Sequence, residues 1–317
     1  MGGLEETVVL VTGATGFIGS HLVKRLVGEG AEVNIISRSK EIRGNLLLKN
    51  LKTEIRIHKA DLREYASIKE CVNNVEPEKV FHLGAFVDLK RDFQTANECV
   101  QTNIQGTLNI LHALRDISCS SFIHIGTYEV YGFNPVPFRE DQPIDPLSPY
   151  SISKACSEFF CRFANKIYNI PTVLLRLSNV YGPNQKSERL IPHVIKCAIK
   201  NMKIKLTEGN QTRDFLYVED AVSAIVKSSL AEKAISEVIN IGSGKEYKVR
   251  DVVQKILDLM GSSIAPRYGE LKHRAYEPER LYCDITKAKG ILKWSPRYDL
   301  EEGLRKTIHW YEENMGR

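Results

Sequence analysis

The sequence predicts an α/β fold in which helices pack on both sides of a parallel, doubly wound sheet. Three observations predict it: a β-branched run at Thr7–Thr12, a glycine-rich turn directly after it, and a helical pattern that ends at Gly28-Glu29-Gly30. An apolar run without polar alternation is typical of a strand that is buried on both faces. Strand, glycine turn and helix in this order form a dinucleotide cradle, so the fold class is Rossmann-type.

The glycine turn has the spacing G-x-x-G-x-x-G, which differs from the commoner G-x-G-x-x-G. Glycines let the backbone approach a pyrophosphate, and the N-terminus of the following helix attracts its negative charge. We therefore expect the turn to bind the cofactor through Gly13, Thr15, Gly16, Phe17, Ile18 and Gly19.

The second predicted strand, Glu32–Ile36, is followed by Ser37 and Arg38. An acidic residue at this place holds the ribose hydroxyls of NAD, whereas an arginine accommodates the 2′-phosphate of NADP. The alternative is a solvated arginine at a strand end. The sequence favours NADP(H) as the cofactor and leaves NAD(H) open.

Further strands and helices alternate along the chain, as a parallel sheet requires. The composition changes after residue 175, and no low-complexity linker separates the two parts. We expect a dinucleotide-binding domain at 1–175 that carries the catalytic residues, and a smaller α/β lobe at 176–317 that mainly binds substrate and is interleaved with it. The strands are expected at 54–59, 79–83, 121–125 and 172–177, and the helices near 65–74, 93–114, 150–168, 190–200, 220–230, 250–260 and 301–314.

The most informative pair of residues is Tyr150 and Lys154. On a helix, positions i and i+4 share one face, so the two side chains project side by side. A nearby ammonium favours the phenolate of a tyrosine and makes proton exchange with an alcohol feasible. Thr127, Tyr128 and Glu129 follow the strand at 121–125, at the edge of the sheet where open α/β sheets bind their ligands.

The glycine turn and the Y-x-x-x-K pattern together resemble the extended short-chain dehydrogenase/reductase family of nucleotide-sugar epimerases, dehydratases and reductases. Matches to the patterns of this family run along nearly the whole chain. They are Asp61-Leu62-Arg63, His82-Leu83-Gly84-Ala85, Asn103-Ile104-Gln105-Gly106-Thr107, Val130-Tyr131-Gly132, Arg176-Leu177-Ser178-Asn179-Val180-Tyr181-Gly182-Pro183, Arg213-Asp214-Phe215-Leu216-Tyr217-Val218-Glu219-Asp220 and Asn240-Ile241-Gly242-Ser243-Gly244.

The resemblance implies a role for each residue of the site. Thr127 would hydrogen-bond the sugar oxygen, Tyr150 would exchange its proton, and Lys154 would tune Tyr150 and hold the nicotinamide ribose. Asp61 and Leu62 would edge the adenine, with a helix cap as the alternative for Asp61. The remaining assignments are Leu83, Gly84 and Ala85 beside the nicotinamide half, and Tyr128, Asn179, Arg213 and Arg274 on the substrate, with Arg280 a weaker candidate.

The substrate arginines and Asn103 each have a structural alternative. Each substrate arginine could instead form a surface salt bridge. Asn103 would help to position the catalytic helix by resemblance, or is a satisfied core residue; we do not count it as catalytic.

The resemblance implies hydride transfer at C4 of a nucleotide-diphosphate sugar. Dehydratases of the family carry Thr-Asp-Glu, and this chain has Thr127-Tyr128-Glu129, so the acid is missing. With Arg38, this favours a 4-keto reductase slightly over a 4-epimerase. A 4,6-dehydratase or a decarboxylase using Glu129 stays an alternative, and so does a silent NADP-binding module, although such modules lose Tyr or Lys of the motif.

The composition indicates a globular protein with a small ligand. Lys+Arg 44 against Asp+Glu 39 gives a net charge of +5 without a basic run, which favours small anions over nucleic acid. The 7 cysteines form no C-x-x-C pattern, so we expect reduced thiols, mostly buried, and no metal site.

The start of the chain shows no signal peptide and no apolar run reaches spanning length, so we expect a cytoplasmic protein without membrane contact. By resemblance we expect a homodimer, paired through the helices near 93–114 and 150–168.

Overall fold

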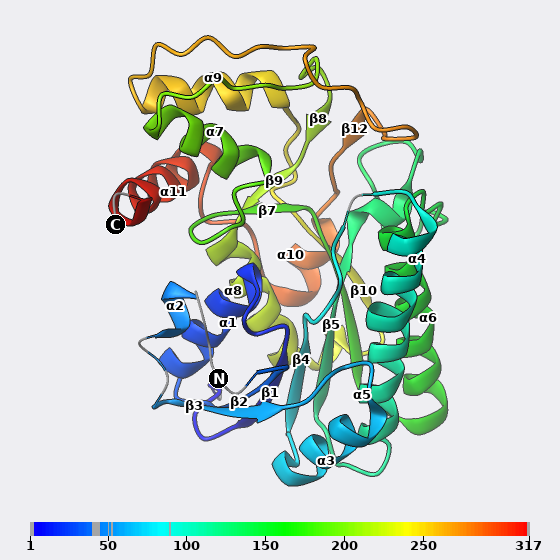
Figure 1. Cartoon of the computed structure of the whole chain (residues 1–317). Helices are drawn as coiled ribbons and strands as arrows, with labels where there is room; N and C mark the ends of the chain where they lie inside the picture. The colour runs from blue at the N-terminus through cyan, green and yellow to red at the C-terminus, as the bar shows by residue number, and fades with distance from the viewer. Residues whose placement is uncertain (1–2, 40–44, 50, 52, 89, 316–317) are drawn as a thin grey trace.

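The computed structural model describes residues 3–39, 45–49, 51, 53–88 and 90–315. Its main sheet has seven strands in the order β10-β6-β5-β4-β1-β2-β3. Every neighbouring pair of these strands runs parallel (Figure 1). The predicted fold class is therefore confirmed. The strands are β1 (Val8–Thr12), β2 (Glu32–Ser37), β3 (Ile55–Lys59), β4 (Lys79–His82), β5 (Ser121–Thr127), β6 (Thr172–Leu177) and β10 (Val238–Ile241).

Two apolar layers sandwich the sheet, because successive side chains of a strand point to opposite faces. In β1, Val9 and Val11 belong to the core that includes α1 and α8, whereas Leu10 belongs to the core that includes α3, α5 and α6. The helices of these layers are α1 (Phe17–Gly28), α2 (Leu46–Lys49), α3 (Tyr65–Val75), α4 (Phe93–Cys99), α5 (Gly106–Leu114), α6 (Pro149–Tyr168), α8 (Val218–Leu230) and α10 (Thr286–Leu292).

The segment expected as one helix at 93–114 is divided into three. A π-helical turn, η1 (Val100–Gln105), separates α4 from α5. The carbonyl of Asn103 in this turn accepts hydrogen bonds from the hydroxyls of Thr107 at 2.6 Å and Ser157 at 2.9 Å. Such single π turns recur at functional sites, and this one faces the helix that carries Tyr150 and Lys154.

Helix α6 begins at a well-formed cap. The Ser148 hydroxyl accepts a hydrogen bond from the backbone of Ser151 at 3.0 Å, and the Ser151 hydroxyl accepts one from the backbone of Ser148 at 3.0 Å. Pro149 occupies the first turn, where its missing N–H costs nothing. This cap fixes the start of the helix one residue before Tyr150.

The chain beyond β6 builds a lobe from two small sheets and three helices (Figure 1). Strand β10 then returns to the main sheet and pairs with β6, so the two parts are interwoven. The expected boundary at residue 175 falls inside β6. In the lobe, β7 (Asn179–Tyr181) pairs with β9 (Phe215–Tyr217), and a second sheet has the order β11 (Tyr247–Lys248), β8 (Thr212–Arg213) and β12 (Arg280–Leu281). The helices of the lobe are α7 (Leu190–Ile199), α9 (Val249–Leu259) and α11 (Leu300–Met315). Elsewhere in the chain, short 3-10 turns lie at Tyr128–Tyr131 and Glu232–Ala234.

The cysteine thiols lie in several parts of the fold. Each cysteine is a free thiol, and only Cys119 and Cys156 are not buried. Among the described residues, no helix is long and apolar enough to cross a membrane. Within the same residues, no cluster of histidine, cysteine and acidic side chains could hold a metal ion.

Candidate active site

The glycine turn lies between β1 and α1 and is packed so tightly that side chains are excluded. Gly13 has a φ of 67°, and a Cβ placed there would lie 2.7 Å from the backbone nitrogen of Gly84. A Cβ at Gly19 would collide with the carbonyl oxygen of Gly13. Glycine is therefore required at both positions by backbone conformation and by close approach.

The N-terminus of α1 has no internal anion. Its N-cap is Gly16, which offers no capping side chain, and its first turn contains no acidic residue. The backbone N–H groups of this turn and the helix dipole are then free to attract a negatively charged group. A pyrophosphate would fit this turn, and the binding of one by Gly13–Gly19 stays a prediction.

The residues that follow β2 and β3 include the predicted cofactor residues Arg38 and Asp61. Arg38 is exposed at the end of β2, and its positive charge reaches Asp61, which follows β3. Arg63 donates two side-chain hydrogen bonds to Asp61, at 3.0 and 2.7 Å, and these bonds lower the pKa of the Asp61 carboxyl. Asp61 does not cap α3, because the N-cap residue there is Glu64.

Leu62 packs beneath the loop that follows β4. A Cβ at Gly84 would lie 2.6 Å from the side chain of Leu62, and a Cβ at Gly106 would meet the same leucine at 2.9 Å. The predicted cofactor residues Leu62 and Gly84 are thus brought together from different strands. Leu83 and Ala85 flank Gly84 in the same loop and are half-buried.

The four candidate catalytic residues come from β5, the turn after it and α6. Thr127 ends β5, is 6% exposed, and its hydroxyl accepts a hydrogen bond from the backbone of Glu129 at 3.2 Å. Tyr150 is half-buried, and Lys154 is 2% exposed one turn further along α6. Burial lowers the pKa of Lys154 to about 8, since a desolvated ammonium is disfavoured.

The pKa of Tyr150 is raised above its usual value. Burial is the main cause, and the negative charge of Glu129 adds to it. Arg189 acts in the opposite direction and lowers the pKa of Tyr150. The tuning of Tyr150 by Lys154 stays a prediction.

Asn103 connects three parts of the site. Its amide oxygen accepts a hydrogen bond from the backbone of Phe86 at 2.7 Å, and its amide nitrogen donates to the carbonyl of Phe86 at 3.0 Å and to the hydroxyl of Ser153 at 2.8 Å. Ser153 precedes Lys154 on α6. Asn103 therefore fixes the loop after β4 against the helix that carries Tyr150 and Lys154.

Sequence reasoning missed Arg189. This residue is the N-cap of α7 and is half-buried. Burial raises the pKa of Glu129, and the charges of Arg189 and Arg213 oppose that increase. No local pattern marks Arg189, because the fold alone brings the start of α7 to Glu129 and Tyr150.

Tyr128 takes a different position from its neighbours Thr127 and Glu129. It is 1% exposed and packs edge-on against Phe138, with ring centroids 6.2 Å apart. Its hydroxyl has no hydrogen-bond partner among the described residues, and burial raises its pKa well above the usual value. A buried phenol with a raised pKa is a poor proton donor for a departing hydroxyl group.

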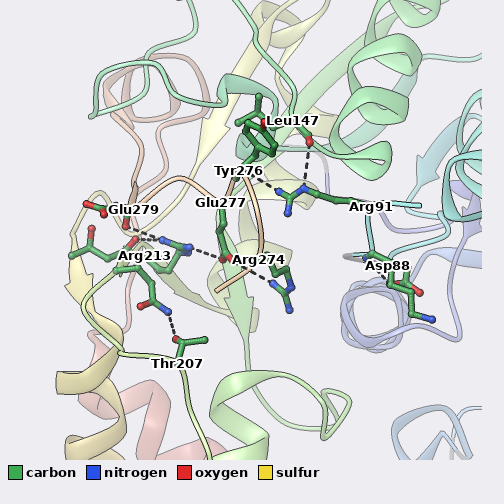
Figure 2. A network of polar contacts seen from close by, with 12 residues as sticks. Asp88, Arg91, Leu147, Thr207, Arg213, Arg274, Tyr276, Glu277 and Glu279 are labelled. Atoms are coloured by element: carbon green, nitrogen blue, oxygen red, sulfur yellow. Dashed lines mark hydrogen bonds and ion pairs between the residues drawn. The ribbon is translucent and has the colours of Figure 1, made fainter. Parts of the chain in front are cut away.

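The predicted substrate arginines lie in the lobe (Figure 2). The Arg213 guanidinium donates to the Glu277 carboxylate at 2.7 Å, and Arg274 lies 3.7 Å from the other oxygen of that carboxylate. Asn179 is close by, because β7 pairs with β9 and puts Asn179 opposite Phe215. Arg280 is an exposed partner of Glu246 at 2.7 Å, which is the salt bridge considered as its alternative.

Comparisons with known proteins agree with this geometry. The sequence model of the family described as GDP-mannose 4,6 dehydratase matches residues 10–307. A protein of Methanocaldococcus jannaschii named "Putative UDP-glucose 4-epimerase" is 35% identical, over 97% of this chain and 99% of its own length. The dTDP-glucose 4,6-dehydratase of Haemophilus influenzae is 32% identical, over 96% of this chain and 97% of its own.

A solved structure shares the whole fold. The UDP-glucuronic acid 4-epimerase of Bacillus cereus, in complex with UDP-glucuronic acid and NAD, superposes with a TM-score of 0.88 at 31% identity, over 96% of this chain and 99% of its own. The chain belongs to the extended short-chain dehydrogenase/reductase family of nucleotide-sugar epimerases and dehydratases. The family predicted from the sequence is thus confirmed.

Proposed function

We propose that this protein is an enzyme that transfers a hydride between a nicotinamide dinucleotide and C4 of a nucleotide-diphosphate sugar. Two observations support the proposal: Thr127 ends β5, the neighbour of β4, and Asn103 joins the loop after β4 to the helix that carries Tyr150 and Lys154. Thr127 would orient the sugar oxygen, and Tyr150 would move its proton. Lys154 would hold the nicotinamide ribose.

The dinucleotide is supported by the fit of the glycine turn. The excluded side chains at Gly13 and Gly19 and the uncapped N-terminus of α1 leave room and charge for a pyrophosphate. Bound there, the nicotinamide would supply the hydride chemistry, and the protein would orient it. The structural relative from Bacillus cereus contains NAD, which supports the same class of cofactor here.

Two reactions at C4 use this site differently. A 4-epimerase oxidises and re-reduces the sugar on one retained cofactor, whereas a 4-keto reductase consumes NADPH. Arg38 supports the reductase slightly, while the relatives named as 4-epimerases support the epimerase. We place the epimerase first, because those relatives match nearly the whole chain, and the reductase second.

The test is the nucleotide that purified protein releases on heat denaturation. A retained dinucleotide at about one per chain supports the epimerase or a dehydratase over the reductase, because both recycle the cofactor without releasing it. An empty site together with NADPH consumption on a 4-keto nucleotide sugar would move the reductase to first place. Absence of any dinucleotide binding would contradict both reactions.

Replacing Arg38 with aspartate is expected to weaken NADP(H) binding and to improve NAD(H) binding. A carboxylate repels the 2′-phosphate and accepts hydrogen bonds from the ribose hydroxyls. Titration of both dinucleotides measures the change. The matched variant Arg38→Gln should weaken NADP(H) binding without improving NAD(H), and equal affinities in wild type and Arg38→Asp would show that Arg38 does not contact the cofactor.

A 4,6-dehydratase is the second candidate class, because Glu129 is present and a relative of that name covers the same length. Against it, Tyr128 stands where these enzymes carry an acid and is buried against Phe138. Nucleotide-sugar decarboxylases, which also use a glutamate here, and a silent dinucleotide-binding module are less favoured. The presence of both Tyr150 and Lys154 argues against a silent dinucleotide-binding module.

Replacing Glu129 with glutamine separates these classes. An epimerase or reductase needs no base for the C5 proton, so it should keep most of its activity, within about tenfold. A dehydratase should lose about 10²-fold or more. Turnover with a panel of nucleotide sugars is the measurement, and collapse of activity with intact binding would favour the dehydratase and make Tyr128 a candidate for the missing acid.

We also propose that the chain forms a homodimer through the outward faces of the segment 93–114, which comprises α4, η1 and α5, and of α6. These elements lie together on one side of the sheet (Figure 1). Both faces expose large apolar side chains, among them Phe93, Val100, Phe159 and Ile167. Sedimentation should show a dimer at micromolar concentration. Val100→Glu should give monomers because it buries a charge in the interface. Leu230→Glu, at a similarly exposed site at the end of α8, should not. A monomeric wild type would contradict the proposal.

A further inference from the structure

A carboxylate of the chain itself occupies the space between the two substrate arginines. Glu277 accepts a hydrogen bond from Nη2 of Arg213 at 2.7 Å, and its other oxygen lies 3.7 Å from Nη1 of Arg274 (Figure 2). The Arg213 side chain is 7% exposed, whereas that of Arg274 is 51% exposed. A buried guanidinium without an anion is costly, so Glu277 satisfies a charge that the fold has already removed from water.

Arg213 is also held by hydrogen bonds that do not involve the Glu277 side chain. Its Nη1 donates to the backbone carbonyls of Thr212 at 2.7 Å and Glu279 at 3.0 Å. Each guanidinium nitrogen of this type has two hydrogens, so these two bonds use both hydrogens of Nη1. Nη2 can therefore exchange one anion for another while the plane of the guanidinium stays fixed.

The segment that carries Arg274 and Glu277 is also attached on its other side. Arg91 donates from Nη2 to the carbonyl of Tyr276 at 3.3 Å and from Nε to the carbonyl of Leu147 at 3.4 Å. Leu147 directly precedes the Ser148 cap of α6. The segment thus bridges the lobe and the start of α6, and Glu277 is the side chain through which it contacts Arg213.

We propose that Glu277 is an internal anion that occupies the arginine site of the unliganded protein, and that the diphosphate of the substrate displaces it from Arg213 and Arg274. The inference rests on the proposed function, which assigns these arginines to the diphosphate. A diphosphate carries more charge than one carboxylate and spans both arginines, so it is the stronger partner. Glu277 then lowers the affinity of the site, because each binding event breaks its contact.

The experiment titrates inorganic pyrophosphate calorimetrically into protein saturated with whichever dinucleotide, NAD⁺ or NADP⁺, binds more tightly, so that the glycine turn is already filled. Glu277→Gln should tighten pyrophosphate binding about 5- to 30-fold, the range expected for removing one close competing charge. Glu277→Asp keeps the charge but shortens its reach, so it should tighten binding by a smaller factor. Glu279→Gln removes an exposed carboxylate in the same segment and should change binding less than about twofold.

The outcomes separate the inference from the proposed function. Unchanged or weaker pyrophosphate binding in Glu277→Gln overturns the inference, and so does equal tightening in Glu279→Gln, which would indicate a general charge effect. Arg213→Gln should weaken pyrophosphate binding at least about tenfold. If Arg213→Gln binds pyrophosphate as the wild type does, the assigned diphosphate site is wrong and the proposed function loses its substrate contact. If Arg213→Gln weakens pyrophosphate binding while Glu277→Gln leaves it unchanged, only the inference fails.

Discussion

Replacing Tyr150 with phenylalanine is expected to lower turnover by about 10²–10⁴-fold and to leave nucleotide binding nearly intact. The substitution removes one hydroxyl from a half-buried ring on α6 and changes no other contact by more than the size of that group. The hydroxyl is the group that would exchange a proton with the sugar. Hydride transfer followed by nicotinamide absorbance in a single turnover measures the effect, and dinucleotide titration measures binding.

The control for this prediction is Tyr168→Phe. Tyr168 is the last residue of the same helix and is exposed. Its loss should leave turnover within about twofold, because its hydroxyl is solvated. If Tyr150→Phe kept more than about a tenth of the wild-type rate, proton exchange would have to run through another group, and Glu129, whose charge acts on Tyr150, would be the first candidate.

Replacing Arg176 with methionine is expected to lower the free energy of unfolding by about 3–5 kcal/mol. Arg176 on β6 donates to both oxygens of Glu158 on α6, at 3.1 and 2.7 Å, and both side chains are nearly fully buried. The guanidinium also stacks over the ring of Tyr131, 4.7 Å from its centroid. Removal of Arg176 alone leaves the Glu158 carboxylate buried without its partner.

Chemical denaturation of wild type, Arg176→Met and Arg176→Met/Glu158→Gln measures this effect. The double variant should recover part of the lost stability, since the carboxylate is removed with its partner. An exposed pair serves as comparison: Arg305→Met breaks the contact with Glu301 on α11 and should cost less than about 1 kcal/mol. Equal losses for Arg176→Met and Arg305→Met would mean that burial does not strengthen the first pair.

The parts of the site that the sequence predicts are those with a local signal. The run at β1, the glycines that follow it and the start of α1 are neighbours in the chain, so their order alone specifies a cradle. Tyr150 and Lys154 are one helical turn apart, and the turn length is fixed by helix geometry. The structure places these groups where the sequence predicts them.

The remaining parts depend on contacts between distant residues. The π turn at Val100–Gln105 coincides with hydrogen bonds from Asn103 to Phe86 and Ser153, which no helical periodicity encodes. The electrostatic environment is nonlocal in the same way. Glu129 and Arg189 are among the charges that shift the pKa of Tyr150, and both lie far from Tyr150 in the chain.

Strand β10 has a consequence for the synthesis of the chain on the ribosome. It pairs with β6 at the end of the main sheet, but it comes from Val238–Ile241, long after the catalytic helix. Until these residues emerge, β6 presents an unpaired edge lined by apolar residues that are buried in the finished protein. Such an edge is a template for pairing with another chain. The nascent protein therefore carries Thr127, Tyr150 and Lys154 before β10 covers the exposed edge of the sheet.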